Sequence, residues 1–469
     1  MTALLLADPH GSRPIHLVPC SRWSAWLSEQ PANRRAWIAS TGFAPEAGKT
    51  LLLPGPDGAL AAAVAVVHEP ATLWDAAAVA AALPRGGWRL EDPRGVLDPA
   101  EAALGWLLAL YRFERYRKPG EEPPGLVVPD AAARTRAETI ARAVRLARDL
   151  VNTPANDLGP AELEAAAAEL ALETGARFSS IVGEALLEAG YPLVYAVGAA
   201  SPRPPRLIEL VWGEPDAPKV TLVGKGVCFD TGGLDIKPSS AMLLMKKDMG
   251  GAAVMLGLLR AVAGLGLPLR LRVLVPAVEN AIGGRAFRPG DVLRSRKGIT
   301  VEIANTDAEG RLILADALFE ADREDPDLLL DAATLTGAAR VALGPELPAL
   351  FTPDEALAGE LLAAGERVGE PLWRLPLHAP YRKYLESRVA DIANASQKNF
   401  AGAITAALFL QEFVSPGRTW AHLDVFAWND ESRPGRPKGG EATGLRPLLE
   451  LLEHRFAHDR ERRSGGARR

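Results

Sequence analysis

Cysteine, long apolar runs and excess positive charge are all scarce in this sequence, and each shortage excludes a class of protein. The 469 residues include 2 cysteines, Cys20 and Cys228, too few for a disulfide-rich secreted scaffold, so we expect free thiols in a reducing compartment. No uninterrupted apolar run reaches the roughly 20 residues of a membrane-spanning helix. The N-terminus, MTALLLADPHGSRP, lacks the basic start of a signal peptide. We therefore predict a cytoplasmic protein without a membrane partner.

The charge balance argues against a nucleic-acid partner. The net charge is −5 at pH 7, whereas proteins that bind nucleic acid through bulk charge are basic. Hydrophobic residues make up 48% of the chain and charged residues 24%, which is typical of a globular protein. A chain of this length is expected to form about two to four domains.

A proline-rich segment, residues 118–131 (KPGEEPPGLVVPDA), marks the predicted boundary between two domains. Before this segment, the hydrophobic patterns predict strands at residues 51–54 and 62–67 and helices at residues 73–83 and 102–116. The pattern indicates a small N-terminal α/β domain.

A long helix is predicted after the boundary, from about residue 132 to 151, and Pro154 limits its extension. Beyond it, the predicted strands lie at residues 191–201, 207–212, 220–223, 269–276, 299–303 and 328–333, and the predicted helices at 161–176 and 252–263. We therefore predict an α/β protein whose larger C-terminal domain has a central mixed sheet flanked by helices. The predicted parts are an N-terminal domain (1–130), a connecting helix (131–155), a C-terminal domain (156–457) and a disordered basic tail (458–469).

The stretch VEIANTDAEGRLILADAL, residues 301–318, reads as a strand, a polar turn and a helix. In an open α/β sheet, a turn at the carboxyl end of a strand is where ligands bind. The acids Asp307 and Glu309 also have a purely structural interpretation, because carboxylates favour helix N-termini. This stretch alone does not decide between a ligand site and a helix N-terminus stabilised by carboxylates.

A second polar cluster, residues 220–253, has the same placement after a buried strand. It runs VTLVGKGVCFDTGGLDIKPSSAMLLMKKDMGGAA. Its glycines do not form a phosphate-binding loop, because that loop places its lysine last, beside a hydroxyl. Here Lys225 comes first, and the acids Asp230 and Asp248 follow.

The candidate site residues from the two clusters are four carboxylates (Asp230, Asp248, Asp307 and Glu309), two lysines (Lys225 and Lys237) and Arg311. Four acids around one point would be forced to take up protons unless cations balanced their charge. Oxygen-rich sites suit Mg²⁺, Mn²⁺ and Zn²⁺, and pairs of such ions serve hydrolases. The sequence therefore predicts two divalent ions per subunit.

The motifs GKGVCFDTGG, IKP, MKKDMGGAA and NTDAEGRL resemble those of the leucyl aminopeptidase family, the two-metal M17 cytosol aminopeptidases. The resemblance extends over about residues 145–452. It implies a metal-dependent aminopeptidase that hydrolyses N-terminal, preferably leucine-like residues from peptides with a free N-terminus. It also implies a homo-hexamer.

The resemblance implies a role for each motif residue. The implied metal ligands are Lys225, Asp230, Asp248, Asp307 and Glu309. Asp230 and Glu309 would bridge the two ions, Lys225 and Asp248 would complete the tighter site, and Asp307 would complete the exchangeable one. The implied catalytic pair is Lys237 and Arg311, with bicarbonate held at Arg311.

The chemistry of these side chains agrees with the implied roles. Lys225 can ligate a metal only as the free amine, whereas a charged Lys237 would polarise the scissile carbonyl and stabilise the oxyanion. Arg311 does not deprotonate, but its guanidinium suits a planar anion. A water molecule between the two ions would be the nucleophile.

The substrate-binding residues implied by the resemblance are Met245, Asn305, Ala308, Thr334, Leu335 and Gly337. We expect His422, in a buried strand, to be structural. The competing hypothesis is a non-catalytic or moonlighting DNA-binding scaffold of the same fold. The complete set of ligands and catalytic residues favours the enzyme.

Overall fold

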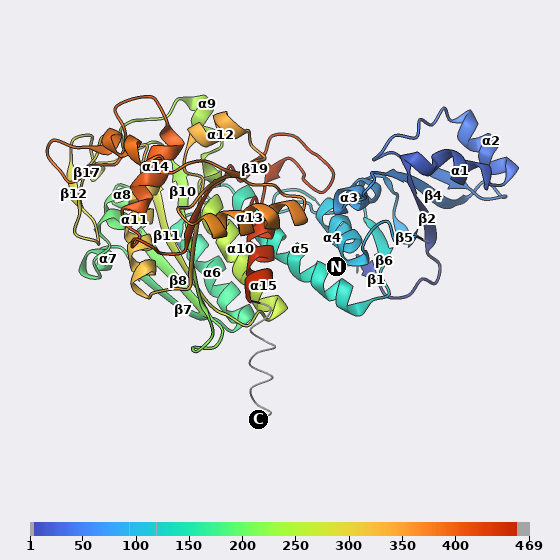
Figure 1. Ribbon diagram of the computed structural model, residues 1–469, viewed down its shortest axis with the longest axis horizontal. Helices are drawn as coiled ribbons and strands as arrows, with labels where there is room; N and C mark the ends of the chain where they lie inside the picture. Colours follow the sequence, from blue (N-terminus) through green and yellow to red (C-terminus); the bar gives the residue numbers. More distant parts are fainter. Residues whose placement is uncertain (1–3, 93, 119, 457–469) are drawn as a thin grey trace. The chain divides into compact units, whose positions relative to one another are not determined.

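The computed structural model describes residues 4–92, 94–118 and 120–456 (Figure 1). The chain divides into two compact units, one formed by Met1–Arg142 with Glu431–Lys438 and the other by Ala143–Asp430 with Gly439–Arg469. The predicted basic tail, residues 458–469, lies outside the described residues.

The N-terminal unit contains a six-stranded sheet in the order β1-β6-β5-β2-β4-β3. All neighbouring pairs are parallel except β3 with β4. The strands are β1 (Leu5–Leu6), β2 (Arg13–Pro19), β3 (Thr50–Pro54), β4 (Leu60–Val67), β5 (Gly86–Glu91) and β6 (Pro124–Val127). The helices are η1 (Cys20–Arg22), α1 (Trp23–Ser28), α2 (Ala32–Ser40), α3 (Leu73–Ala82) and α4 (Pro99–Ala109).

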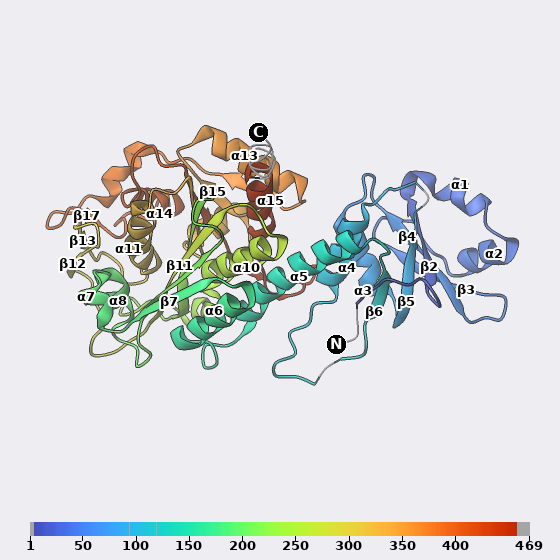
Figure 2. The same cartoon turned by 90° about the horizontal axis from the view of Figure 1, so that it is seen from below.

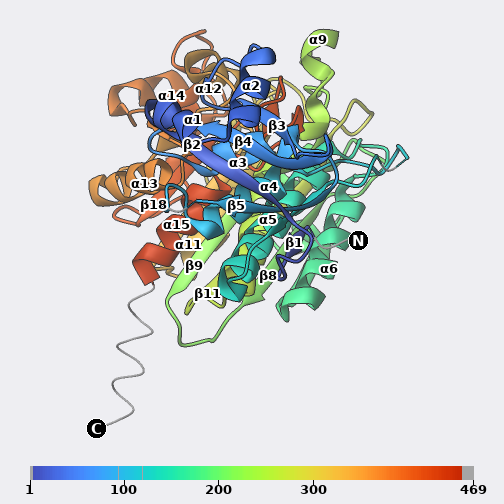
Figure 3. The same ribbon diagram turned by 90° about the vertical axis from the view of Figure 1, so that its right-hand side faces the viewer.

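Helices α3 and α4 pack against each other beside this sheet (Figure 3). A Cβ at Gly105 would lie 2.0 Å from the carbonyl oxygen of Leu73, so the close approach requires glycine. The predicted helix at residues 102–116 is wrong at its end, because α4 stops at Ala109. Beyond that residue the sequence alternates charged and aromatic residues (RFERYRK) and has no continuous apolar face to bury.

The larger unit contains a nine-stranded mixed sheet. Its order is β16-β15-β18-β14-β9-β11-β8-β7, with β10 paired to β11. The strands β18, β14, β9 and β11 run parallel, whereas β15 and β8 pair antiparallel with β18 and β11. The strands are β7 (Arg177–Val182), β8 (Arg206–Trp212), β9 (Lys219–Gly224), β10 (Gly226–Asp230), β11 (Arg270–Asn280), β14 (Leu328–Ala333), β15 (Ala349–Phe351), β16 (Trp373–Arg374) and β18 (Trp420–Asp424).

Helices cover both faces of this sheet (Figure 2). One layer consists of α6 (Pro160–Thr174), α10 (Gly250–Leu265) and α15 (Leu445–Phe456), and the other of α8 (Pro192–Gly198), α11 (Gly310–Arg323) and α14 (Gly402–Gln411). The helix α5 (Ala131–Asn152) corresponds to the predicted long helix. The observed architecture confirms the predicted α/β fold class with its larger mixed-sheet domain.

The remaining elements are short or lie at the periphery of the larger unit. They are α7 (Ala185–Glu188), α9 (Ser239–Met242), η2 (Met245–Lys247), β12 (Val292–Arg294), β13 (Thr300–Glu302), α12 (Gly337–Leu343), α13 (Glu355–Arg367), η3 (Ala379–Leu385), β17 (Ile392–Ala393), β19 (Trp428–Asn429) and β20 (Gly439–Gly440).

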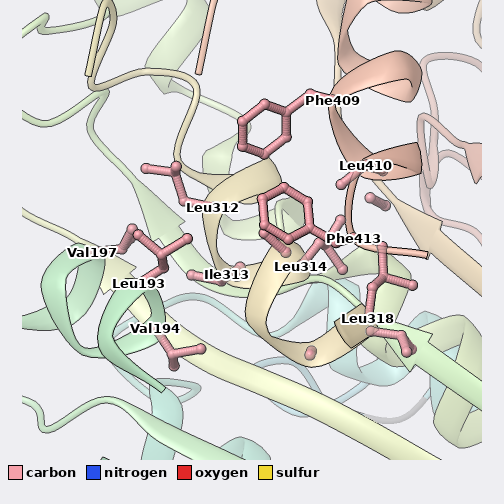
Figure 4. Close-up of a cluster of buried hydrophobic side chains, with 14 of the residues drawn as sticks. Leu193, Val194, Val197, Leu312, Ile313, Leu314, Leu318, Phe409, Leu410 and Phe413 are labelled. Carbon is pink, nitrogen blue, oxygen red and sulfur yellow. The ribbon is translucent and has the colours of Figure 1, made fainter. Parts of the chain in front are cut away.

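The predicted strand at residues 191–201 is wrong, because this segment contains helix α8. Val194 and Val197 suggested a strand, but tertiary contacts outweigh that preference. The buried carboxylate of Asp316 on α11 accepts the backbone N–H groups of Leu193 and Val194 at 2.8 and 3.4 Å, satisfying donors at the helix start. The apolar side chains of α8 then pack against α11, in the same buried cluster as residues of α14 (Figure 4).

Residues Met245–Leu265 are long and apolar enough to pass for a membrane span, but most of them are buried inside the larger unit. The stretch includes α10, whose fully buried residues Val254, Leu258 and Leu259 pack in the core. Core helices of globular proteins share this composition.

Candidate metal centre

Two of the five candidate ligands lie at the carboxyl ends of strands in the nine-stranded sheet, and the other three lie in turns before helices. Lys225 directly follows β9, Asp230 ends β10, and Asp248 follows η2 just before α10. Asp307 and Glu309 lie in the turn that leads into α11. The fold therefore brings both clusters to one edge of the sheet, where α/β proteins bind ligands.

Two glycines allow the backbone to approach this closely. A Cβ at Gly224 would lie 2.6 Å from the Cα of Ala252 at the start of α10. A Cβ at Gly310 would lie 2.6 Å from the Cε of Lys225. A larger residue at position 224 would push α10 away from the end of β9, and one at position 310 would displace the side chain of Lys225.

The charged groups form two linked contact sets. The Nζ of Lys225 lies 2.8 Å from Oδ2 of Asp248 and 3.0 Å from Oε1 of Glu309. The Nζ of Lys237 lies 2.8 Å from Oδ2 of Asp230 and also contacts Asp307. Asp230, Asp307 and Glu309 each offer one carboxylate oxygen, all within 4.8 Å of one another.

Burial and mutual repulsion shift the ionisation of these acids. Burial, with the charge of Asp230, raises the pKa of Glu309 to about 8 and that of Asp307 to about 6. The pKa of Asp248 is raised mainly by burial. Burial disfavours the charge of Lys225, but Asp248, Glu309 and Asp230 outweigh burial and raise its pKa. The two lysines cannot neutralise four carboxylates, so the centre holds more negative charge than positive.

Divalent ions fit the donor groups at this centre. Glu309 is 1% exposed. The Nζ of Lys225 approaches its Oε1 at 3.0 Å, whereas its Oε2 has no hydrogen-bond partner among the described residues. Buried carboxylate oxygens without donors are costly unless a cation approaches them. The carboxylates together with one lysine nitrogen match the ligand preferences of Mn²⁺, Zn²⁺ and Mg²⁺.

Neighbouring polar groups orient the candidate ligands. The amide of Asn280, at the end of β11, donates to Oδ1 of Asp230 at 2.8 Å. The hydroxyl of Thr334 donates to Oδ1 of Asp248 at 2.8 Å, and the carbonyl of Thr334 accepts from Lys225 at 3.1 Å. Such outer contacts hold metal ligands in place. The sequence analysis did not assign Asn280 a role, although a polar residue ending an apolar strand was a usable signal.

Arg311, on the first turn of α11, is buried beside Asn394. Its Nη1 donates to the carbonyl oxygen of Asn394 at 2.7 Å, whereas its Nε has no partner among the described residues. Burial lowers the pKa of Arg311 to about 10, partly offset by Glu309 and Asp424. The side chain of Asn394 accepts from Ala304 and donates to Ala308, which fixes the turn before α11.

A cavity of about 450 Å³ opens onto the centre. Four of the predicted substrate-binding residues line it, namely Met245, Thr334, Leu335 and Gly337. Asn305 and Ala308 instead lie in the turn before α11 and are not among the lining residues. His422 is fully buried, and its Nδ1 lies 2.5 Å from Oδ1 of Asp331, in agreement with a structural role.

The cavity also has lining residues that the sequence analysis missed, namely Lys247, Arg340, Asp424 and Phe426. Asp424, at the end of β18, accepts from the N–H groups of Leu335 and Thr336 at 3.0 and 3.2 Å and from the Thr336 hydroxyl at 2.6 Å. This buried carboxylate thus shapes the loop beside the centre. Nothing in local sequence pattern relates residue 424 to residue 335.

Sequence comparisons relate both parts of the chain to known proteins. A model of the cytosol aminopeptidase family catalytic domain matches residues 145–449, and a model of the M17 aminopeptidase N-terminal domain matches residues 13–129. A probable cytosol aminopeptidase of Roseiflexus castenholzii is 46% identical over 367 residues, covering 74% of this chain and 75% of that protein. A probable cytosol aminopeptidase of Rhodococcus opacus is 38% identical over 449 residues, covering 90% of this chain and 88% of that protein.

Solved structures are similar over nearly the whole chain. The cytosol aminopeptidase of Coxiella burnetii gives a TM-score of 0.93 at 49% identity, covering 97% of this chain and 99% of that one. The bottromycin maturation enzyme BotP in complex with Mn gives a TM-score of 0.85 at 39% identity, covering 95% of this chain and 100% of that one.

Proposed function

This chain belongs to the M17 cytosol aminopeptidase family, and we propose that it uses two divalent ions to hydrolyse N-terminal, preferably leucine-like residues from peptides. The observation that carries the proposal is the convergence of Asp230, Asp248, Asp307 and Glu309 on one point, where Oε2 of the buried Glu309 has no hydrogen-bond donor among the described residues. A purely structural cluster would satisfy that oxygen with a donor.

The residues that would hold the ions are Lys225, Asp230, Asp248, Asp307 and Glu309. When bound, the ions supply an acidified water molecule and a Lewis acid for the scissile carbonyl. Lys225 would serve as the neutral amine, and its remaining N–H would donate to the carbonyl of Thr334, which lies 3.1 Å away. Asn280 and Thr334 would hold Asp230 and Asp248 in position.

Lys237 is the proposed electrophilic catalyst. Its amine contacts Asp230 and Asp307, and those carboxylates raise its pKa although burial opposes the charge. Lys237 therefore keeps its proton, and its charge would stabilise the oxyanion that develops on the substrate carbonyl.

Arg311 is the proposed holder of a planar anion, such as bicarbonate, that accepts a proton during hydrolysis. The contact with Asn394 fixes one end of the guanidinium and leaves Nε without a partner among the described residues. A fixed guanidinium with free N–H groups suits a planar oxyanion.

The substrate would lie in the 450 Å³ cavity with its free amine near Asp248. Met245 and Leu335 would contact the first side chain and favour apolar residues. Thr334 and Gly337 would offer main-chain groups to the peptide, and Asn305 and Ala308 would support the rim. We propose Mn²⁺ or Zn²⁺ as the ions, with Mg²⁺ as an alternative, and a cytoplasmic homo-hexamer as the working form.

Hydrolysis of leucine p-nitroanilide by Mn²⁺-loaded protein tests the proposal, with an EDTA-treated sample as the control. We expect turnover that EDTA abolishes and that added Mn²⁺ restores. A metal-replenished sample that leaves every unblocked substrate intact would refute the proposed function. A gel shift at moderate salt tests the DNA-binding alternative in the same preparation.

A further inference from the structure

One wall of the cavity carries two cations that have no acidic partner. Lys247 and Arg340 both line the cavity, and neither side chain forms an ion pair or hydrogen bond with any residue in the described ranges. The other two lysines of the cavity differ in this respect, because Lys225 and Lys237 each contact two carboxylates.

The aromatic ring of Phe426 brings the two cations together. The Nζ of Lys247 lies 4.5 Å from the ring centroid and the Cζ of Arg340 lies 5.2 Å from it. Cation–π attraction offsets part of the repulsion between the two charges. The ring cannot act as a directional acceptor for their N–H groups, so those donors stay available.

The nearby acids are already engaged by other groups. Asp424 accepts three hydrogen bonds from the Leu335–Thr336 segment, and Asp248 contacts Lys225 and Thr334. Lys247 itself is only 5% exposed, so its ammonium group is largely desolvated. The charges of Asp248 and Asp424 act on it, but among the described residues no carboxylate forms an ion pair with it. An anionic ligand would provide that compensation.

We propose that Lys247, Arg340 and Phe426 form an anion subsite that binds a carboxylate of the substrate. The subsite rests on the proposed aminopeptidase function and adds a preference for substrates with a negative charge near the N-terminus. The carboxylate comes either from the C-terminus of a dipeptide or from the side chain of an acidic first residue. The apolar lining residues Met245 and Val425 would take the hydrocarbon part of the same substrate.

The test compares matched substrates that differ in one charge. For the C-terminal source, the ratio of kcat/KM for Leu-Gly to that for Leu-Gly-amide is measured. For the side-chain source, the ratio for Glu p-nitroanilide to Gln p-nitroanilide is measured. Lys247→Met keeps a side chain of similar length but removes the charge. We expect one of the two kcat/KM ratios to fall about tenfold, mainly through KM. This is the size of effect expected when a hydrogen bond to a charged group is lost.

Two further variants separate charge from structure. Lys247→Arg should keep most of the affected ratio, because it retains the cation. Lys246 is a neighbouring lysine that does not line the cavity, and its Nζ donates to the carbonyl of Asn152 at 2.6 Å. Lys246→Met should therefore leave both ratios unchanged.

The two ratios also identify the source of the carboxylate. A fall only in the dipeptide ratio assigns it to the C-terminus, and a fall only in the p-nitroanilide ratio assigns it to the first side chain. Unchanged ratios in Lys247→Met, with leucine p-nitroanilide still hydrolysed, overturn the subsite and leave the proposed function standing.

Calorimetry on EDTA-treated protein measures the effect of each charge on affinity without turnover. One pair of ligands is Leu-Gly and Leu-Gly-amide, and the other is glutamate amide and glutamine amide. A protein that hydrolyses nothing would refute the aminopeptidase proposal, and these affinities would still decide the subsite. Equal affinities within both pairs overturn it.

Discussion

Gly310 leaves room for the side chain of Lys225, because a Cβ at position 310 would come within 2.6 Å of Cε and 2.7 Å of Nζ of that lysine. The first residue of α11 thus limits where the amine of a proposed metal ligand can lie. The same turn carries Glu309, whose Oε1 is 3.0 Å from the same Nζ. A side chain at residue 310 would therefore displace the amine of Lys225 from its present place beside Glu309.

Gly310→Ala should displace Lys225 and weaken metal binding while the protein still folds. Displaced or unsupported ligands typically cost about 10–100-fold in metal affinity, and we expect a loss in that range by calorimetric Mn²⁺ titration. Gly359→Ala in α13 is the matched control, because a Cβ there meets no atom within 4 Å. Equal affinities in the two variants would contradict the steric argument.

Lys237→Ala and Asp248→Ala should separate catalysis from metal binding. Lys237→Ala removes the proposed oxyanion-stabilising charge and should lower kcat by about 10²–10³-fold. Calorimetry should show that this variant still binds two ions. Asp248→Ala should instead weaken the tighter ion, because a carboxylate ligand is removed. If both variants kept full rates on leucine p-nitroanilide, the proposed roles of these two residues would be wrong.

The metal-free protein should lose stability as the pH rises from about 4.5 to about 8. The pKa of Glu309 is raised from 4.5 to about 8, so in this window the folded state holds a proton that the unfolded state has released. The raised pKa of Asp307, about 6, acts in the same direction. Thermal unfolding in EDTA should therefore show a falling Tm across this range. Mn²⁺-loaded protein should show a smaller decline, because bound ions keep Glu309 and Asp307 deprotonated. The rest of the decline comes from Asp316, whose pKa burial raises to about 7 away from the centre.

Asp424→Ala should raise KM and lower stability without changing metal affinity. The substitution removes the acceptor for the N–H groups of Leu335 and Thr336, and leaving buried donors unsatisfied costs about 1–3 kcal/mol. Asp424→Asn is the matched comparison, since its carbonyl oxygen can still accept from those groups. Steady-state kinetics would show the difference in KM between the two variants, and urea unfolding the difference in stability. Identical KM values for both variants would exclude the loop-positioning role.

Helix α8 and the end of α4 show where local patterns fail. The segment YPLVYAVG has the β-branched residues of a strand, yet Asp316, more than a hundred positions away, accepts the N–H groups that start its helix. The helix predicted to reach residue 116 ends at Ala109, where alternating charged and aromatic residues leave no continuous apolar face to bury.

The sequence by itself determined the α/β class, the two candidate loops and the chemistry of their acids and lysines, because strand patterns and motif residues are local properties of the chain. Only the tertiary structure decided which distant groups meet. It brought Asn280 to Asp230, Asp424 to the loop at Leu335, and Lys247 to Arg340 across the ring of Phe426. Such contacts depend on the packing of strands and helices far apart along the chain, and no local pattern encodes that packing.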